Sequence, residues 1–425
     1  MNTGSIDGII NESDLLLLCI LKNAIAGQYI KDLKVNSSLL REMLAGAEIH
    51  QILPLICEAI YMSPSVSKDK WFNYKKRQAI ELTVNQEVRT LEFLDLYHEM
   101  SRRNLHPVVV KGSSLSHLYP WGSHRYSLDE DILVAEDAFS DVHEFLLSEE
   151  LQLMQKDQDL LRAGEVSYCR PATGFYLEVH KKMFSGPEMI TCWNPFFEKS
   201  MSRSKKMCLQ GTEIRVLDNT DMLLYLVLHA LKHFLHSGFG IRQVSDICLF
   251  AAVHEAHIDW KQLRYHVCQA HAEHLLTAVF KIGCQYLLSD AQAAGIKANW
   301  NVNLPVDETP LLKDILSGGI TGNASLDRLH SSSITLQAVM GKGNKADRVL
   351  RTVFPSAKEL SKRYPYLEKL PVLLPAAWIS RILDYMKESR ISDKGGVNAS
   401  ETVRIAEERI RLLCQYRLLP GNRNK

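Results

Sequence analysis

The sequence predicts an α+β protein in which a mixed sheet is flanked by helical regions on its N-terminal and C-terminal sides. Helical periodicity runs through residues 12–100 and returns from Asp221 onward. Between them, residues 105–217 hold short apolar segments with the period of two that strands show. The chain has 425 residues, 46% of them hydrophobic, which is enough for two or three structural units. The expected N-terminal helical region, core and C-terminal helical region span residues 1–104, 105–220 and 221–425.

The N-terminal region is expected to be helical. Ser13 can cap an apolar helix over Leu15–Lys22, because a serine hydroxyl accepts hydrogen bonds from the free amides of the first turn. The pattern of Trp71–Met100 predicts one long helix, which delivers the chain to a first strand after Pro107.

The core region begins with two predicted apolar strands and a Gly-Ser turn between them. Val108–Val110 leads into Lys111-Gly112-Ser113, and a second strand begins at Asp129-Glu130-Asp131. Because successive side chains on a strand point to opposite faces, Asp129 and Asp131 project the same way, about 7 Å apart. Magnesium takes hard oxygen ligands and is usually held by one or two carboxylates together with substrate phosphates. The pair therefore predicts a magnesium site, and the ligand that best suits such a site is a nucleoside triphosphate.

A later strand offers a second polar face. The segment Thr173–His180 alternates between apolar and polar side chains, and its polar face carries Tyr176, Glu178 and His180. This face is the best candidate in the chain for completing the metal site, with His180 lining the cleft beside Glu178. One more strand is expected over Glu213–Leu217, after a Gly turn.

Basic residues accompany these acids in the sequence. Lys111 precedes the Gly-Ser turn, Arg125 precedes Asp129 by four residues, and Lys181 follows the polar strand. Fixed cations beside a metal stabilise the charge that develops on a leaving pyrophosphate. We therefore expect Lys111, Arg125 and Lys181 to bind the nucleotide, and for Lys181 a solvated position on a loop stays open.

The first helix of the C-terminal region carries a histidine stripe. Tyr225, His229, His233 and His236 recur at i, i+4, i+8 and i+11, so they share one side of a leucine-rich helix. No Glu follows the first histidine as a zincin requires, and no third ligand is marked, which argues against zinc. We expect the stripe to pack under the nucleotide cleft or to line it through His229 and His233.

Composition and charge narrow the classes of function. The formal net charge is +1, which argues against a long nucleic-acid track but leaves room for a local basic patch. Nine cysteines are scattered without a Cys-x-x-Cys pair, as in reduced cytoplasmic proteins. The charge order at the N-terminus is wrong for a secretory signal, and no run approaches the roughly 18 apolar residues of a membrane span. We expect a cytoplasmic protein that makes no membrane contact.

The order of these motifs resembles the nucleotidyltransferase superfamily, whose fold is shared with DNA polymerase β. The superfamily pattern is Gly-Ser, a short helix and then Asp-x-Asp on a strand, and Gly112-Ser113 and Asp129-x-Asp131 fill those places. Together with Lys111, Arg125 and Leu177–His180, they look more narrowly like a bacterial family described as uncharacterised nucleotidyltransferases. Members of that family often accompany peptide natural-product clusters, including those for lasso peptides.

This resemblance implies a metal-dependent enzyme that moves a nucleoside monophosphate from a nucleoside triphosphate to a hydroxyl or phosphate group, releasing pyrophosphate. Asp129, Asp131 and Glu178 would be catalytic and would hold Mg²⁺ or Mn²⁺. Gly112 and Ser113 would hold the phosphates through backbone amides and the serine hydroxyl. The acceptor would be a peptide or a small metabolite from a biosynthetic cluster.

One residue departs from the family's pattern. The residue between the two aspartates is usually apolar, and here it is Glu130. By alternation Glu130 shares a face with Leu128 and Ile132. We therefore expect it at a wet strand end or as an extra acid near the site.

Two other classes of function stay open. A toxin-like enzyme that modifies tRNA or another RNA would use the same catalytic parts, and a concentrated basic surface around the cleft would favour it. A catalytically inactive nucleotide-binding module is the alternative without chemistry. A Glu178 side chain that points away from the aspartates would favour the inactive module.

Overall fold

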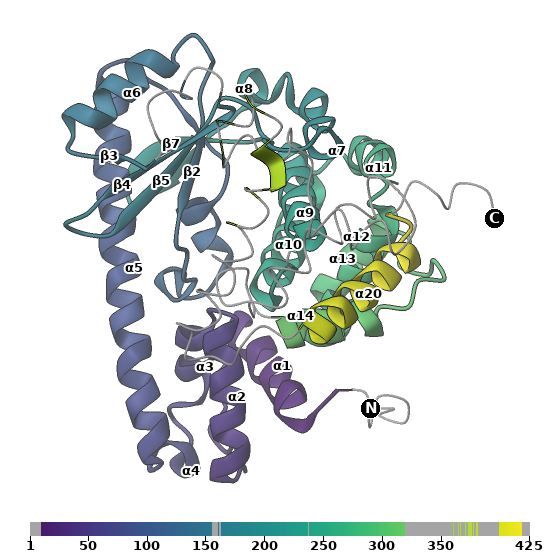
Figure 1. Cartoon of the computed structure of the whole chain (residues 1–425). Coiled ribbons are helices and arrows are strands. Elements are labelled where there is room, and N and C mark those ends of the chain that lie inside the picture. Colours follow the sequence, from purple (N-terminus) through teal and green to yellow (C-terminus); the bar gives the residue numbers. More distant parts are fainter. Residues whose placement is uncertain are drawn as a thin grey trace. The chain divides into compact units, whose positions relative to one another are not determined.

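The structure is a computed structural model that describes residues 10–154, 160, 163–236, 238–318, 360, 364, 366, 370, 373–375, 377, 380 and 399–418. These residues form an α+β fold with one seven-stranded mixed sheet and helices at both ends (Figure 1). The fold class predicted from the sequence is therefore confirmed. The chain divides into two compact units, which are Met1–Leu231 with Gly240–Ile320 and Lys232–Phe239 with Thr321–Lys425.

The N-terminal region consists mainly of helices. Its helices are α1 (Glu12–Ile25), α2 (Ser37–Ile49), α3 (Leu53–Ile60), α4 (Pro64–Ser67) and α5 (Lys70–Arg102). The cap of α1 is Asn11, whose side chain accepts a hydrogen bond from the amide of Asp14 at 2.7 Å. The expectation that Ser13 caps this helix is wrong, because the helix begins earlier and Ser13 lies inside it. The long helix expected over Trp71–Met100 is confirmed as α5.

The sheet supplies the framework of the core. Its strands are β1 (Val108–Val109), β2 (Glu130–Leu133), β3 (Gln152–Leu153), β4 (Glu165–Arg170), β5 (Phe175–His180), β6 (Lys205–Leu209) and β7 (Thr212–Val216). Their order across the sheet is β3-β4-β5-β2-β1-β7-β6. β2 pairs with β5 in parallel and with β1 in antiparallel orientation. β6 and β7 form a hairpin, and β7 confirms the strand expected over Glu213–Leu217.

Helix α5 packs against the sheet through buried contacts. Tyr97 is 1% exposed, and its hydroxyl donates to the carbonyl oxygen of Pro107 at 2.9 Å. The same hydroxyl accepts a hydrogen bond from the amide of Arg215 at 2.8 Å. Because Pro107 precedes β1 and Arg215 lies in β7, one tyrosine ties the helix to two neighbouring strands.

The remaining elements are mainly helical. Short 3-10 or π segments are η1 (Gly112–Leu118), η2 (Gly122–His124), η4 (Asn194–Phe197), η5 (Glu255–His257) and η6 (Gly283–Leu287). The α-helices are α6 (Phe139–Ser148), α7 (Glu188–Thr191), α8 (Ser200–Arg203), α9 (Asn219–His236), α10 (Ile241–Val253), α11 (Trp260–Gln269), α12 (Glu273–Ile282), α13 (Asp290–Asn299), α14 (Thr309–Gly318) and α20 (Ala399–Gln415). Within the second unit, Arg409 of α20 is buried and donates to the carbonyl oxygen of His236 at 2.7 Å.

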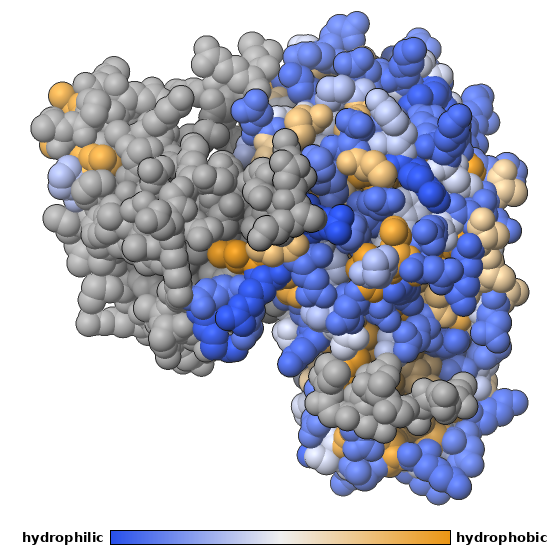
Figure 2. Space-filling view, turned by 90° about the vertical axis from the view of Figure 1, so that its right-hand side faces the viewer, coloured by the Kyte–Doolittle hydropathy of each residue, from blue (hydrophilic) through white to orange (hydrophobic). Residues whose placement is uncertain are grey.

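The face shown in Figure 2 is mostly hydrophilic among the described residues, with hydrophobic side chains in small patches. In the described part of the chain, each helix is too short or too polar to cross a membrane.

Candidate active site

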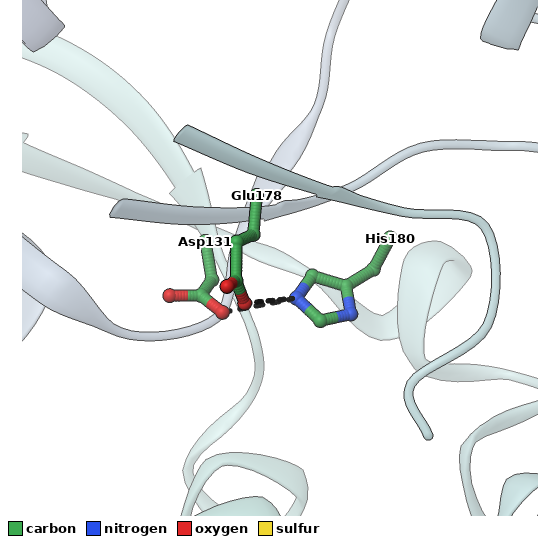
Figure 3. A group of neighbouring side chains, drawn as sticks. All are labelled: Asp131, Glu178 and His180. Carbon is green, nitrogen blue, oxygen red and sulfur yellow. Dashed lines mark hydrogen bonds and ion pairs between the residues drawn. The ribbon is translucent and has the colours of Figure 1, made fainter. Parts of the chain in front are cut away.

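Two adjacent strands near the middle of the sheet bring the acidic residues together. In the parallel pairing of β2 with β5, Asp131 lies opposite Glu178 and Leu133 lies opposite His180. Figure 3 shows the side chains of Asp131, Glu178 and His180 converging from these strands. One ligand atom from each of the three lies within 4.8 Å of the others. The polar face predicted for β5 therefore meets Asp131 of β2.

Asp129 joins this group through a lysine. The Nζ atom of Lys111 lies 2.6 Å from Oδ2 of Asp129 and 3.0 Å from Oδ2 of Asp131. Both aspartates thus face the same ammonium group, as the alternation of side chains along a strand requires. Burial lowers the pKa of Lys111, but the two carboxylates outweigh it and raise that pKa well above the usual value. The lysine therefore stays charged at neutral pH.

Asp131 is the most buried acid of the group. Burial alone would raise its pKa, but Lys111 and the hydrogen bond from His180 lower the pKa to about 2. Its Oδ1 atom lies 2.9 Å from Nε2 of His180. Its Oδ2 atom is buried and accepts no hydrogen bond, although the ammonium of Lys111 lies nearby. Asp131 is thus an anionic carboxylate with one oxygen that can take a further ligand.

His180 lies among acids from three strands, which are β2, β4 and β5. Its Nε2 atom is 3.7 Å from Oε2 of Glu178, and its Nδ1 atom is 3.7 Å from Oε2 of Glu165 on β4. Burial lowers the pKa of His180, but the hydrogen bond to Asp131 and the surrounding acids give a net rise. Glu165 was not predicted as a site residue, although the turn residues Pro171–Gly174 could have indicated a hairpin that pairs Glu165 with His180.

Glu178 has the opposite electrostatic character from Asp131. Burial, together with the negative charge of Asp131, raises its pKa to about 8. Two carboxylates and an imidazole so close together form a set of oxygen and nitrogen ligands that suits a divalent cation. The buried Oδ2 of Asp131, which has an ion pair with Lys111 but no hydrogen-bond partner, supports the same fit. The residues of this site therefore match the chemistry of a metal centre.

A family model described as uncharacterised nucleotidyltransferase matches residues 37–286. That range covers more than half of the chain, including every strand of the described sheet. The chain belongs to this nucleotidyltransferase family. The resemblance to uncharacterised nucleotidyltransferases, found in the sequence, is therefore confirmed. No curated protein and no solved structure was found to match the chain.

In this nucleotidyltransferase, Glu130 does not lie at a wet strand end. Its side chain is 3% exposed, so the expectation of a wet strand end is wrong. Its carboxylate accepts hydrogen bonds from the amide of Ser113 at 2.8 and 3.0 Å and from the hydroxyl of Ser113 at 2.5 Å. Burial raises the pKa of Glu130 to about 8. The Gly-Ser turn covers this strand face, which the sequence pattern of β2 alone could not reveal.

Arg125 hydrogen-bonds to the same turn and forms an ion pair with an acid that lies far away in the sequence. Its Nε and Nη2 atoms lie 2.7 and 2.8 Å from the two carboxylate oxygens of Asp246 on α10. Its Nη1 atom donates to the carbonyl oxygen of Gly112 at 3.0 Å. Arg125 is buried, and Asp246 has no place in the sequence pattern that marked the site. The nucleotide-binding role expected for Arg125 stays a prediction.

The ammonium of Lys181 contacts groups outside the acid group. Its ammonium donates to the carbonyl oxygen of Leu160 at 2.9 Å and lies 4.6 Å from the centre of the Phe139 ring. Its predicted contact with the nucleotide remains untested.

In the histidine stripe, Tyr225 is the residue that interacts electrostatically with the acids of the site. Tyr225 is 1% exposed, and burial and the charge of Asp131 raise the pKa of its phenol well above the usual value. The ring of His229 stacks on Tyr225 with 5.5 Å between centroids. His233 lies one turn further along α9 and is partly buried. Tyr225 is thus the stripe residue whose electrostatic contact with the acids is most direct.

Proposed function

We propose that this nucleotidyltransferase moves a nucleoside monophosphate from a nucleoside triphosphate to a hydroxyl or phosphate group of an acceptor, with release of pyrophosphate. The observation that carries this proposal is the convergence of Asp131, Glu178 and His180 from two paired strands, with Asp129 held beside them by Lys111. Family membership supports the reaction class.

The residues of the site would divide the work. Asp129, Asp131 and Glu178 would hold Mg²⁺ or Mn²⁺, and His180 would keep the carboxylate of Asp131 in place. A bound divalent cation would neutralise phosphate charge and polarise the phosphorus under attack. The ammonium of Lys111 would oppose the negative charge of the triphosphate. Glu178 would complete the metal site or take the proton of the attacking hydroxyl, because its raised pKa suits a base near neutral pH.

The acceptor is proposed to be a peptide or a small metabolite from a natural-product pathway. This part rests on the family resemblance of the sequence and on the net charge of +1, which does not favour a long nucleic acid. A catalytically inactive module is not favoured, because Glu178 and Asp131 lie together. We also propose a cytoplasmic location, since all nine cysteines are free thiols.

The test is a labelling experiment with two positions of the label. The purified protein is incubated with Mg²⁺, a mixture of small peptides and metabolites, and each nucleoside triphosphate labelled at the α- or γ-phosphate. Nucleotidyl transfer leaves α-label on the acceptor and γ-label in pyrophosphate. An acceptor that carries γ-label would instead show phosphoryl transfer and would contradict the proposal. The Asp131→Asn protein serves as the inactive control, and Asp141→Asn, an exposed aspartate on α6, as the matched active one.

A further inference from the structure

Two short segments of the core are joined by alternating contacts. The first runs from Lys111 to Ser113 and the second from Asp129 to Asp131. Lys111 contacts Asp129 and Asp131 on the side of the metal site, whereas Ser113 contacts Glu130. Because neighbouring side chains on β2 alternate, the lysine and serine contacts involve opposite sides of that segment. The turn is thus attached to the strand from both sides.

The Ser113–Glu130 contact is enclosed by protein. Ser113 is 2% exposed and Glu130 is 3% exposed. The serine hydroxyl also lies 3.3 Å from the hydroxyl of Thr90 on α5. With its amide and hydroxyl both directed to Glu130, Ser113 has no exposed donor for a phosphate in this arrangement.

The backbone of the turn depends on the same carboxylate. Gly112 has a φ of +79°, and a Cβ atom built on it would lie 2.1 Å from Oε2 of Glu130. Only glycine therefore combines this backbone conformation with the close approach of Glu130. The carbonyl oxygen of Gly112 accepts a hydrogen bond from Arg125. The turn is therefore held both by the donors of Ser113 and by the carbonyl acceptor of Gly112.

Lys111 immediately precedes this turn, so a shift of the turn would move its backbone. Its ammonium lies within 3.0 Å of both aspartates, and small displacements of charged groups at a reacting centre lower rates strongly. We propose that Glu130 is a positioning residue that fixes the Gly112–Ser113 turn and, through it, Lys111 beside the acids. In this reading Ser113 is the anchor of the turn rather than a phosphate ligand. The inference rests on the proposed function, because it assigns Lys111 to the triphosphate.

The kinetic test compares Glu130→Ala, Glu130→Gln, Ser113→Ala and the double variant Ser113→Ala with Glu130→Ala. Glutamine retains an acceptor for the Ser113 amide, so Glu130→Gln should keep kcat/KM within about threefold of the original, a loss typical of weakening one neutral hydrogen bond. Glu130→Ala should lower kcat/KM by about 10- to 100-fold, since a small misplacement can cost that much. The double variant should be no worse than Glu130→Ala alone. Ser63→Ala, a buried serine of the N-terminal region, is the control.

A direct contact between Ser113 and a phosphate would give a different kinetic result. If Ser113 bound phosphate directly, Ser113→Ala would raise the KM for the triphosphate by the same factor with or without Glu130. That outcome, or an inactive Glu130→Gln protein with an unchanged unfolding temperature, would overturn the positioning role.

A second measurement is independent of turnover. Hydrogen exchange of the amides in Gly112–Leu118 should be faster in Glu130→Ala than in the original protein and close to normal in Glu130→Gln. Unchanged exchange in Glu130→Ala would overturn the inference. If the original protein transfers no nucleotide, the proposed function fails, while the exchange data still decide whether Glu130 holds the turn. If Glu130→Ala does not fold, Glu130→Leu replaces it, since leucine is similar in size but accepts no hydrogen bond from Ser113, and unchanged exchange in Glu130→Leu would overturn the inference.

Discussion

Asp131 is the residue on which the contacts of the site converge. It is fully buried, it accepts a hydrogen bond from His180, and it shares the ammonium of Lys111 with Asp129. A buried carboxylate is costly unless positive groups compensate it, and here two of them do. Its lowered pKa means that the anion persists throughout the range in which an enzyme works.

The first prediction is that Asp131→Asn abolishes nucleotidyl transfer while the protein still folds. An amide cannot replace the negative charge that holds a cation, and even outer partners of metal ligands are worth about 10- to 100-fold. We expect a loss of at least about 10²-fold in labelled product. Circular dichroism checks the fold, and Asp141→Asn should retain full activity. Near-normal turnover in Asp131→Asn would remove Asp131 from the catalytic site.

The second prediction concerns Glu178. Glu178→Gln should lower kcat by about 10²-fold or more, which is the usual contribution of an acid–base group. The KM for the triphosphate should change little, because Asp129, Asp131 and Lys111 would still bind the metal–nucleotide complex. Steady-state kinetics with varied triphosphate separates the two constants. Glu213→Gln, an exposed glutamate on β7, is the matched control, and a large rise in KM with constant kcat in Glu178→Gln would contradict the assignment.

At the scale of the element, the strands near the site could be predicted because their polar and apolar side chains alternate with a period of two. Asp131 and Glu178 lie on the polar faces that alternation assigns to β2 and β5. The sequence pattern could not reveal that β2 and β5 are parallel neighbours, since strand order depends on the packing of the whole sheet. That pairing is what adds His180 to the acids.

The hydrogen-bond partners of Glu130 and Arg125 could not be predicted from the sequence either, because they also depend on how distant segments pack. Arg125 pairs with Asp246, which lies 121 residues further along the chain. A charge with so distant a partner carries no local signal, so Arg125 could be read only as a cation near the acids. Glu130 departs from the apolar pattern of its strand because the turn at Ser113 supplies hydrogen bonds in place of an apolar contact.

A contact between two helices supports a third prediction. His50 at the end of α2 is 1% exposed, and its Nε2 atom lies 3.3 Å from the carbonyl oxygen of Leu316 in α14. Burial lowers its pKa from 6.5 to about 4. As the pH falls, the unfolded chain therefore takes up the proton before the folded chain does. The stability is complete above pH 6.5 and is lost as the pH falls from 6.5 to 4.

The full difference between the two pKa values corresponds to about 3 kcal/mol of unfolding free energy. His50→Gln retains a donor for the carbonyl of Leu316 but cannot titrate. Denaturant unfolding at pH 7 and pH 4.5 should show a smaller loss of stability in His50→Gln than in the original protein. Equal losses in both proteins would show that His50 does not carry this pH dependence.

At the scale of the whole molecule, the site is an acidic spot in a chain whose net charge is only +1. Three carboxylates, from Asp129, Asp131 and Glu178, are opposed there by Lys111 and His180. These positive groups reduce the repulsion among the acids. Folding nonetheless brings together acids from two strands that the unfolded chain keeps apart, so a cation should bind the folded state in preference.

The last prediction follows from that preference. Mn²⁺ should raise the unfolding temperature, because a ligand that binds only the folded state stabilises it by about 2.7 kcal/mol at 100 times its Kd. Thermal unfolding followed by circular dichroism, with and without Mn²⁺, measures the shift. Asp131→Asn should lose most of it, and Asp141→Asn should retain it. A shift of equal size in Asp131→Asn would place the bound cation outside this site, and no shift in the original protein would contradict a metal centre at Asp131 and Glu178.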